Sequence, residues 1–159
     1  MDYLDKIEGD NKLKCKEMFL FFQENCPDAK GSSHNHQTWK GGYFDHISDI
    51  MNYASILYEN LPSLPFSISD VILVLFLHDI EKPIKYSSSN LNFGYTNEEI
   101  RNNLISKFDI KLNDIHVNAL KYIHGEGDDY KSDKRVMNPL CAFCHCCDII
   151  SARIFYDKK

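Results

Sequence analysis

Apolar residues recur at three- and four-residue steps along much of the chain, which is the spacing of one face of an α-helix. The first such segment runs from Lys12 to Cys26 and ends before Pro27. A second begins at Tyr43 and ends before Pro62. Its apolar stripe consists of Ile47, Ile50, Met51, Ala54, Leu57, Tyr58 and Leu61. The pattern predicts two amphipathic helices, each stopped by a proline.

Residues 71–77 are apolar at every position, so they are predicted to lie in the middle of a core rather than at its surface. Ser67 or Ser69 can cap a helix through this stretch. Pro83 follows shortly after it and prevents the helix from continuing. The stretch is therefore predicted to form a helix in the middle of the core.

Capping signals predict three further helices. Thr96–Glu99 has the sequence of a capping box, and Asn113 or Asp114 starts a helix that ends at Gly125. Asn138-Pro139 combines a capping residue with a proline in the first turn, which favours a last helix from there. Because no segment shows a convincing strand alternation, we predict an all-α fold, a compact bundle of about six helices.

Composition agrees with one globular domain over residues 1–159, since the chain has 159 residues, 43% of them hydrophobic and 26% charged. No apolar stretch is long enough to span a bilayer, and Met1–Tyr3 opens an acidic, polar segment unlike a signal peptide. We therefore expect a cytoplasmic protein without membrane contact. The net charge of −5 disfavours duplex DNA as a partner and leaves small anionic substrates as the easier choice.

Four of the six cysteines lie within residues 141–147, where disulfides between near neighbours are geometrically awkward. Residues 141–145 also match the attachment pattern of c-type haem, which requires an exported protein and an exposed loop. Neither condition is indicated here. We interpret the cysteines as free thiols that pack the last helix.

Two imidazoles and two carboxylates are predicted to face the core from three different helices. His46 borders the apolar stripe of its helix, His78 and Asp79 end the most apolar run, and Asp148 lies among cysteines and isoleucines. Charged groups in such surroundings are costly unless they are compensated, and a bound cation compensates all of them at once. The set suits a divalent ion with open coordination sites, for which hydrolysis of a phosphoester is the natural reaction.

The order of these residues resembles the H…HD…D signature of the HD-domain metal-dependent phosphohydrolases. The likeness rests on Gly41–His46, Leu77–Pro83 and Asp148–Ala152, and it extends over residues 34–153. It implies an α-helical fold and one divalent metal ion on His46, His78, Asp79 and Asp148. It also implies hydrolysis of phosphate esters, often those of nucleotides.

The resemblance also suggests roles for three further residues. Lys82 matches a lysine that binds phosphate in the family, although a lysine at a helix end is also stabilised by the helix dipole. Glu81 stands where many members have glycine, and it brings a further carboxylate near the metal. His124 matches a region that protonates the leaving group or binds a second metal in some branches. We expect Asp79, Lys82 and His124 to act in catalysis, with a single metal.

The glycine-flanked loop before Tyr43 has unusual contents for a loop, since it holds His34, His36, Trp39 and Lys40. These side chains could grip a phosphate and stack a base, and a solvated loop with one pinned tryptophan is an equally open interpretation. The segment before Gly41 and His46 resembles that of an exoribonuclease-like branch of the family, whose members also have histidine and aromatic residues ahead of the first histidine of the signature. With Arg135 from a later loop, these residues are the predicted substrate-binding set.

Together these features predict a phosphohydrolase that acts on a nucleotide with one divalent ion: Mn, Co, Mg, Zn, Ni or Fe. Two alternatives stay open. The first is a phosphodiesterase or exoribonuclease acting on short RNA or a cyclic nucleotide, and the second is a non-catalytic, metal-stabilised domain that binds a nucleotide. Assembly as a homodimer is compatible with each of them.

Overall fold

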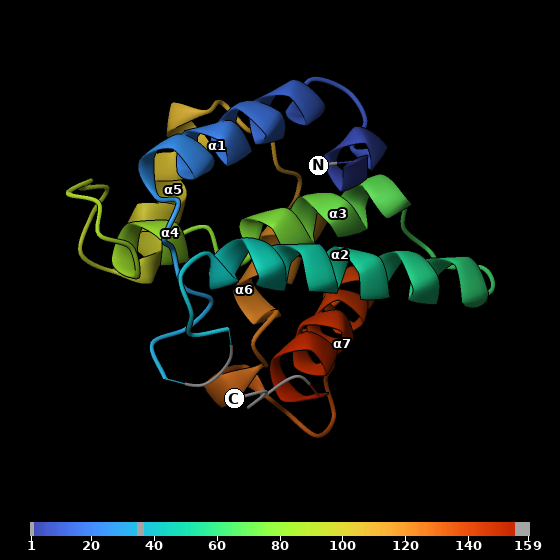
Figure 1. Cartoon of the computed structure of the whole chain (residues 1–159). Coiled ribbons are helices and arrows are strands. Elements are labelled where there is room, and N and C mark those ends of the chain that lie inside the picture. Colours follow the sequence, from blue (N-terminus) through green and yellow to red (C-terminus); the bar gives the residue numbers. More distant parts are fainter. Residues whose placement is uncertain (1, 35–36, 155–159) are drawn as a thin grey trace.

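The computed structural model of the protein describes residues 2–34 and 37–154 (Figure 1). Its helices in chain order are η1 (Asp2–Lys6), α1 (Asn11–Asn25), α2 (Gly42–Asn60), α3 (Ile68–Leu77), α4 (Lys82–Lys85), α5 (Asn97–Lys107), α6 (Asp114–Tyr122), η2 (Gly127–Asp129) and α7 (Pro139–Ile154). Within these residues no β-strand forms, and the predicted all-α bundle is confirmed. None of the described helices combines the length and the apolar character that crossing a membrane requires.

Helix α3 is the centre of the bundle. It contacts α1, α2, α6, α7 and η1, and Figure 1 shows it running beside α2. A complete capping box starts the helix, because the Ser67 side chain accepts a hydrogen bond from the amide of Asp70 and the Asp70 carboxylate accepts one from the amide of Ser67. Every residue from Val71 to Leu77 is buried. The end of α3 therefore delivers the following residues into the interior.

Two glycines determine how the chain enters α2. Gly41 has φ +80°, in the left-handed region that favours glycine. A Cβ atom on Gly42 would lie 2.0 Å from the carbonyl oxygen of Gln37, a contact that no side chain tolerates. The chain before α2 can therefore turn back tightly, which fixes the position of the first turn of α2 and, through it, of His46 at the start of the next turn.

The other predicted helix starts are also confirmed. Thr96 accepts from the amide of Glu99 at the start of α5, and Asn113 caps α6. At the start of α7, the Asn138 side chain accepts from the amide of Cys141 at 2.7 Å. These side chains satisfy backbone donors that would otherwise lack partners at the helix ends.

The cysteines are free thiols, and those at positions 141, 144 and 147 are buried on α7. The thiol of Cys141 donates to the carbonyl oxygen of Ala119 on α6. Burial raises the pKa of Cys141 and of Cys147 to about 12, which keeps both thiols protonated and unreactive. They pack the last helix as expected, whereas Cys146 is exposed.

Candidate metal centre and its pocket

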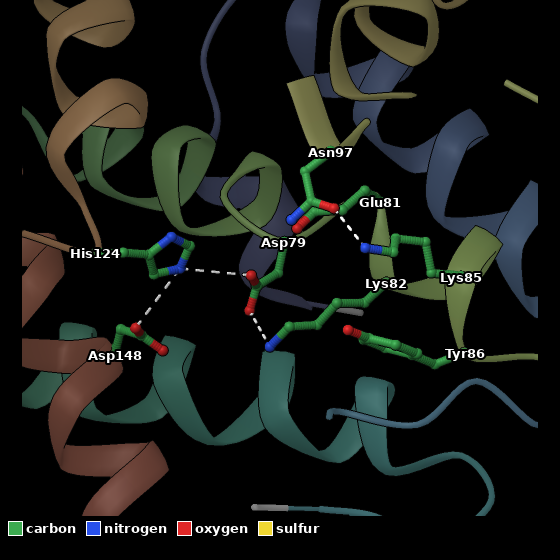
Figure 2. Close-up of a pocket in the computed structure, with 8 residues that line it drawn as sticks. All are labelled: Asp79, Glu81, Lys82, Lys85, Tyr86, Asn97, His124 and Asp148. Carbon is green, nitrogen blue, oxygen red and sulfur yellow. Dashed lines mark hydrogen bonds and ion pairs between the residues drawn. The ribbon is translucent and has the colours of Figure 1, made fainter. Parts of the chain in front are cut away.

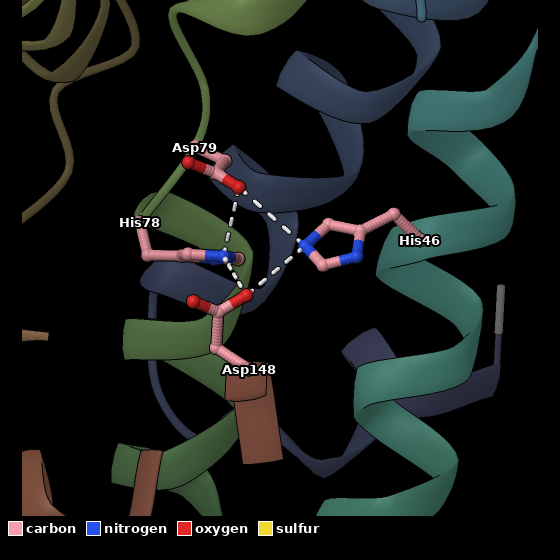
Figure 3. Close-up of side chains that lie close together, drawn as sticks. All are labelled: His46, His78, Asp79 and Asp148. Atoms are coloured by element: carbon pink, nitrogen blue, oxygen red, sulfur yellow. Dashed lines mark ion pairs between the residues drawn. The ribbon is translucent and has the colours of Figure 1, made fainter. Parts of the chain in front are cut away.

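Four side chains from distant parts of the chain meet where α3 ends (Figure 3). His46 comes from α2, Asp148 comes from α7, and His78 and Asp79 follow α3 directly. Each residue offers one ligand atom, and these atoms all lie within 4.8 Å of one another. The convergence expected from the sequence is therefore present in the fold.

The ligand atoms face a common centre. Nε2 of His46 lies 3.4 Å from Oδ2 of Asp79 and 3.4 Å from Oδ1 of Asp148. Nε2 of His78 lies 3.0 Å and 3.6 Å from the same two oxygens. Two imidazole nitrogens and two carboxylate oxygens suit divalent ions of intermediate hardness. This cluster could hold a metal ion.

Both histidines are oriented through their second ring nitrogen. Nδ1 of His78 lies 2.7 Å from the carbonyl oxygen of Leu75, to which only an N–H can donate, so the lone pair of a neutral ring lies on Nε2. Nδ1 of His46 lies 3.1 Å from the hydroxyl of Ser151 on α7. Gln37 donates toward the same hydroxyl at 3.5 Å. Metal-binding histidines in proteins are commonly held in this way.

The cluster concentrates negative charge in the interior. His46 and His78 are fully buried, and the side chains of Asp79 and Asp148 are 3% and 13% exposed. Burial opposes ionisation of Asp148, but its contacts with both histidines outweigh burial and hold the pKa of this carboxyl well below its usual range. Burial likewise opposes protonation of His78, yet the carboxylates of Asp79 and Asp148 raise the pKa of the imidazole to about 10. Two ionised carboxylates therefore attract positive charge to this point.

A pocket of about 260 Å³ opens onto the cluster (Figure 2). It is lined by Asp79, Glu81, Lys82, Lys85, Tyr86, Asn97, His124 and Asp148. Because the two aspartates form part of its wall, a small molecule in this pocket reaches the carboxylates directly. The two buried histidines of the cluster are not among the lining residues.

Two lysines of α4 bring positive charge into this pocket. Nζ of Lys82 lies 2.5 Å from Oδ2 of Asp79, the oxygen that also faces both histidines. Nζ of Lys85, one helical turn later, donates to the side-chain oxygen of Asn97 at 2.6 Å. Figure 2 shows the hydroxyl end of Tyr86 directed toward Lys82. Lys82 lies where the sequence places it, whereas Lys85, Tyr86 and Asn97 were not anticipated.

His124 lies between the cluster and solvent, just beyond the end of α6. Its Nε2 is 3.5 Å from Oδ1 of Asp79 and 3.9 Å from Oδ2 of Asp148. The side chain is 53% exposed, so it can meet both solvent and a molecule in the pocket. The imidazole is thus within reach of a leaving group, as its expected catalytic role requires.

Glu81 brings its carboxylate to the pocket but does not join the four ligands. Its side chain is 4% exposed, and Oε2 lies 3.8 Å from Nη2 of Arg101 on α5. Burial and the nearby charge of Asp79 raise the pKa of Glu81, while Arg101 opposes this shift. Glu81 therefore links the turn that follows α3 to α5.

Of the five predicted substrate-binding residues, the four that the structure describes do not line this pocket. The exposed Trp39 donates its indole N–H to Asp45 at 2.6 Å. His34 and Arg135 are exposed, and Lys40 lines a second pocket that is described below. His36 lies outside the described residues. The path of the loops, which residue order does not determine, keeps the four described side chains out of the pocket wall.

The remaining described histidines are engaged elsewhere. Nε2 of His116 lies 2.8 Å from Oδ1 of Asp70, and Nδ1 of His145 contacts the carbonyl oxygen of Ile123. These contacts fit structural roles for both.

No family model, curated protein or solved structure matches this sequence. The likeness to the HD-domain phosphohydrolases therefore rests on the motif residues themselves, and it stays a prediction.

Proposed function

We propose that this protein is a divalent-metal-dependent phosphohydrolase that cleaves phosphoester bonds of nucleotides. The observation that carries the proposal is the buried cluster of His46, His78, Asp79 and Asp148 beneath a pocket that also presents Lys82. The resemblance of these residues to the HD-domain signature supports the same assignment. The fold alone does not support this assignment, because helical bundles host many unrelated functions.

A single divalent ion is proposed, held by Nε2 of both histidines and one oxygen of each aspartate, because all four ligand atoms face one centre. An ion held by these residues would lower the pKa of a bound water and polarise a phosphoryl oxygen. The mixed nitrogen and oxygen donors are compatible with Mn, Co, Mg, Zn, Ni or Fe, and they favour the transition metals among these.

Three side chains supply the remaining functions. In hydrolysis a water oxygen bonds to phosphorus, the bond from phosphorus to the leaving oxygen breaks, and that oxygen takes up a proton. Asp79 directs its second oxygen, Oδ1, toward His124, where it can accept a hydrogen bond from the attacking water and orient it. Lys82 balances the charge of the phosphoryl group, and His124 delivers the proton to the leaving oxygen.

The pocket supports a nucleotide as the substrate. Its volume of about 260 Å³ lies just below the range of roughly 300–1,000 Å³ that encloses a drug-sized ligand, so it can take a phosphate with its sugar. Two ammonium groups match the charge of a phosphate ester. The ring of Tyr86 at the edge of the pocket offers an aromatic face to a base.

The direct test is turnover of a panel of nucleotides and short oligonucleotides by the purified protein with Mn²⁺, Co²⁺ or Mg²⁺, with the release of phosphate, nucleoside and nucleotide measured. We expect Asp79→Ala to abolish turnover, because this change removes a ligand and the group that orients water. Asp128→Ala is the matched control, since Asp128 is an exposed acid that lines no part of the pocket. Equal turnover by the Asp79→Ala variant would refute the proposal.

The non-catalytic alternative has its own signature in the same experiment. If divalent ions raise the melting temperature of the wild type but not of Asp79→Ala, while no ester in the panel is cut, the cluster binds metal for stability alone. That result would preserve the metal site and exclude the enzymatic function.

A further inference from the structure

A second pocket adjoins the first across the ring of Tyr86. It has a volume of about 550 Å³, and its wall includes Lys30, Lys40 and three serines as well as Tyr86. Among the residues that the structure describes, Tyr86 alone lines both pockets. A molecule bound at the metal centre therefore needs to extend only past this ring to reach the second pocket.

Hydrogen bonds between two chain segments build the wall of the second pocket. The amide of Lys30 donates to the carbonyl oxygen of Tyr86 at 3.1 Å. The amide of Ser88 donates to both carboxylate oxygens of Asp28, at 3.1 Å and 3.2 Å. These bonds hold the segment before α2 against the segment after α4. The backbone of Lys30 is therefore held next to the backbone of Tyr86 by a direct hydrogen bond.

The second pocket carries an excess of positive charge. The hydrogen bond from the Ser88 amide holds the pKa of Asp28 below its usual range, so this acid is ionised and its charge offsets one lysine. The charge of Lys40 also lowers this pKa, so Lys40 is the lysine that Asp28 offsets. Among the described residues, no carboxylate lies within ion-pair distance of either Lys30 or Lys40. In a protein of net charge −5, ammonium groups without a carboxylate at that distance at a concave surface favour a local anion.

The two pockets together form a charged track. Lys82 and Lys85 lie on the metal side of Tyr86, and Lys30 and Lys40 lie beyond it. The phosphates of a nucleoside triphosphate are joined through single oxygens and would stay together on one side of the ring. Successive phosphates of an oligonucleotide are separated by a sugar that carries a base, and an aromatic ring between two cationic sites suits that spacing.

We infer that the substrate is a short single-stranded oligonucleotide, and this inference rests on the proposed hydrolase function. The terminal phosphodiester lies at the metal centre, the adjoining base stacks on Tyr86, and the next phosphate binds Lys30 and Lys40. Water adds to the phosphorus of the terminal diester, the bond to the leaving sugar oxygen breaks, and that oxygen takes the proton. No oxidant or further reactant is needed.

The test compares a 5′-phosphorylated dinucleotide with the mononucleotide of the same base, in the presence of Mn²⁺. The variant combines Lys30→Gln with Lys40→Gln, and the charge-matched control combines Lys131→Gln with Lys134→Gln, two exposed lysines that line neither pocket. We expect the ratio of kcat/KM for the dinucleotide over the mononucleotide to fall about tenfold in the variant and to be unaltered in the control. An unchanged ratio in the variant overturns the inference.

A second readout is the salt dependence of dinucleotide binding, measured by fluorescence with a labelled dinucleotide. Lys30 and Lys40 bind one phosphate, so the double variant should make the slope of log affinity against log salt shallower by roughly 0.7, the value for one neutralised phosphate of a single strand. Tyr86→Leu should weaken dinucleotide binding without altering this slope, because stacking carries no charge. A slope that stays the same in the double-lysine variant contradicts the second subsite.

Binding also separates this inference from the proposed function. If the dinucleotide binds and the double-lysine variant loses that binding while no ester is cut, the subsite stands and the hydrolase proposal fails. If mononucleotides are cut and the dinucleotide neither binds better nor reacts faster, the hydrolase proposal stands and the second subsite is wrong.

Discussion

Replacement of Lys82 by methionine should affect metal binding and turnover in opposite directions. Nζ of Lys82 lies 2.5 Å from Oδ2 of Asp79, and this same oxygen faces the Nε2 atoms of His46 and His78. A divalent ion bound by the cluster would therefore compete with the Lys82 ammonium for one oxygen. Methionine keeps much of the side-chain length and removes the charge.

The size of the effect follows from the contact that is lost. The two side chains are 14% and 3% exposed, so solvent screens the pair little. A hydrogen bond to a charged group contributes about 1.5–3 kcal/mol, which corresponds to roughly ten- to a hundredfold in affinity. We expect the metal to bind more tightly by about this factor. Turnover should fall by about 10²–10³, as it does when one charge-stabilising donor is removed from an active site.

Isothermal titration with Mn²⁺ gives the affinity, and melting curves with and without the ion give the stabilisation. The Lys82→Met variant should be less stable than the wild type without metal and should gain more from metal. Lys85→Met is the control, because its ammonium contacts Asn97 rather than a ligand, and it should leave metal affinity unaltered. If Lys82→Met weakens metal binding, the competition described here does not exist.

Three further predictions concern stability and pH. Ser67→Ala removes one half of the capping box with Asp70 and should lower the free energy of unfolding by about 1–2 kcal/mol in urea titrations; an unchanged midpoint would contradict the role of this cap. Arg101→Met leaves the buried Glu81 carboxyl without its cation and should cost about 2–3 kcal/mol, of which Glu81→Gln in the same chain should recover a part; a double variant no more stable than Arg101→Met would count against the pair. Metal affinity should rise with pH, because burial opposes protonation of His78 but the surrounding carboxylates raise the pKa of its imidazole to about 10, and the ring must release that proton before it can bind a metal. Titrations at pH 6, 7 and 8 should show an affinity that increases by up to about tenfold for each pH unit and each proton released. A pH-independent affinity would exclude competition between a proton and the metal at His78.

Most of the helical architecture could be predicted because it depends on local chemistry. The capping side chains of Ser67, Thr96 and Asn113 act on amides three residues away, so their effect is visible in a short stretch of sequence. The apolar character of residues 71–77 likewise predicts burial on all sides, and the fold buries each of them. These signals do not depend on how the helices are arranged.

The ligand cluster could be anticipated for a different reason. A buried imidazole or carboxylate needs a partner, and four such groups at core-facing positions have few other ways to be satisfied than by one another and a cation. The lining of the pocket could not be anticipated in the same way. Asn97 and Tyr86 reach it through the path of the loop between α4 and α5, while Trp39 binds Asp45 instead. Side chains on loops are placed by contacts between distant segments, which the order of residues does not reveal.

The central claim is that His46, His78, Asp79 and Asp148 bind one divalent ion. Crystals soaked with Mn²⁺ and measured with anomalous scattering at the manganese edge test it most directly. We expect one strong anomalous peak among the four side chains, within bonding distance of Nε2 of each histidine and of one oxygen of each aspartate. A peak elsewhere, or none among these side chains at saturating Mn²⁺, would contradict it.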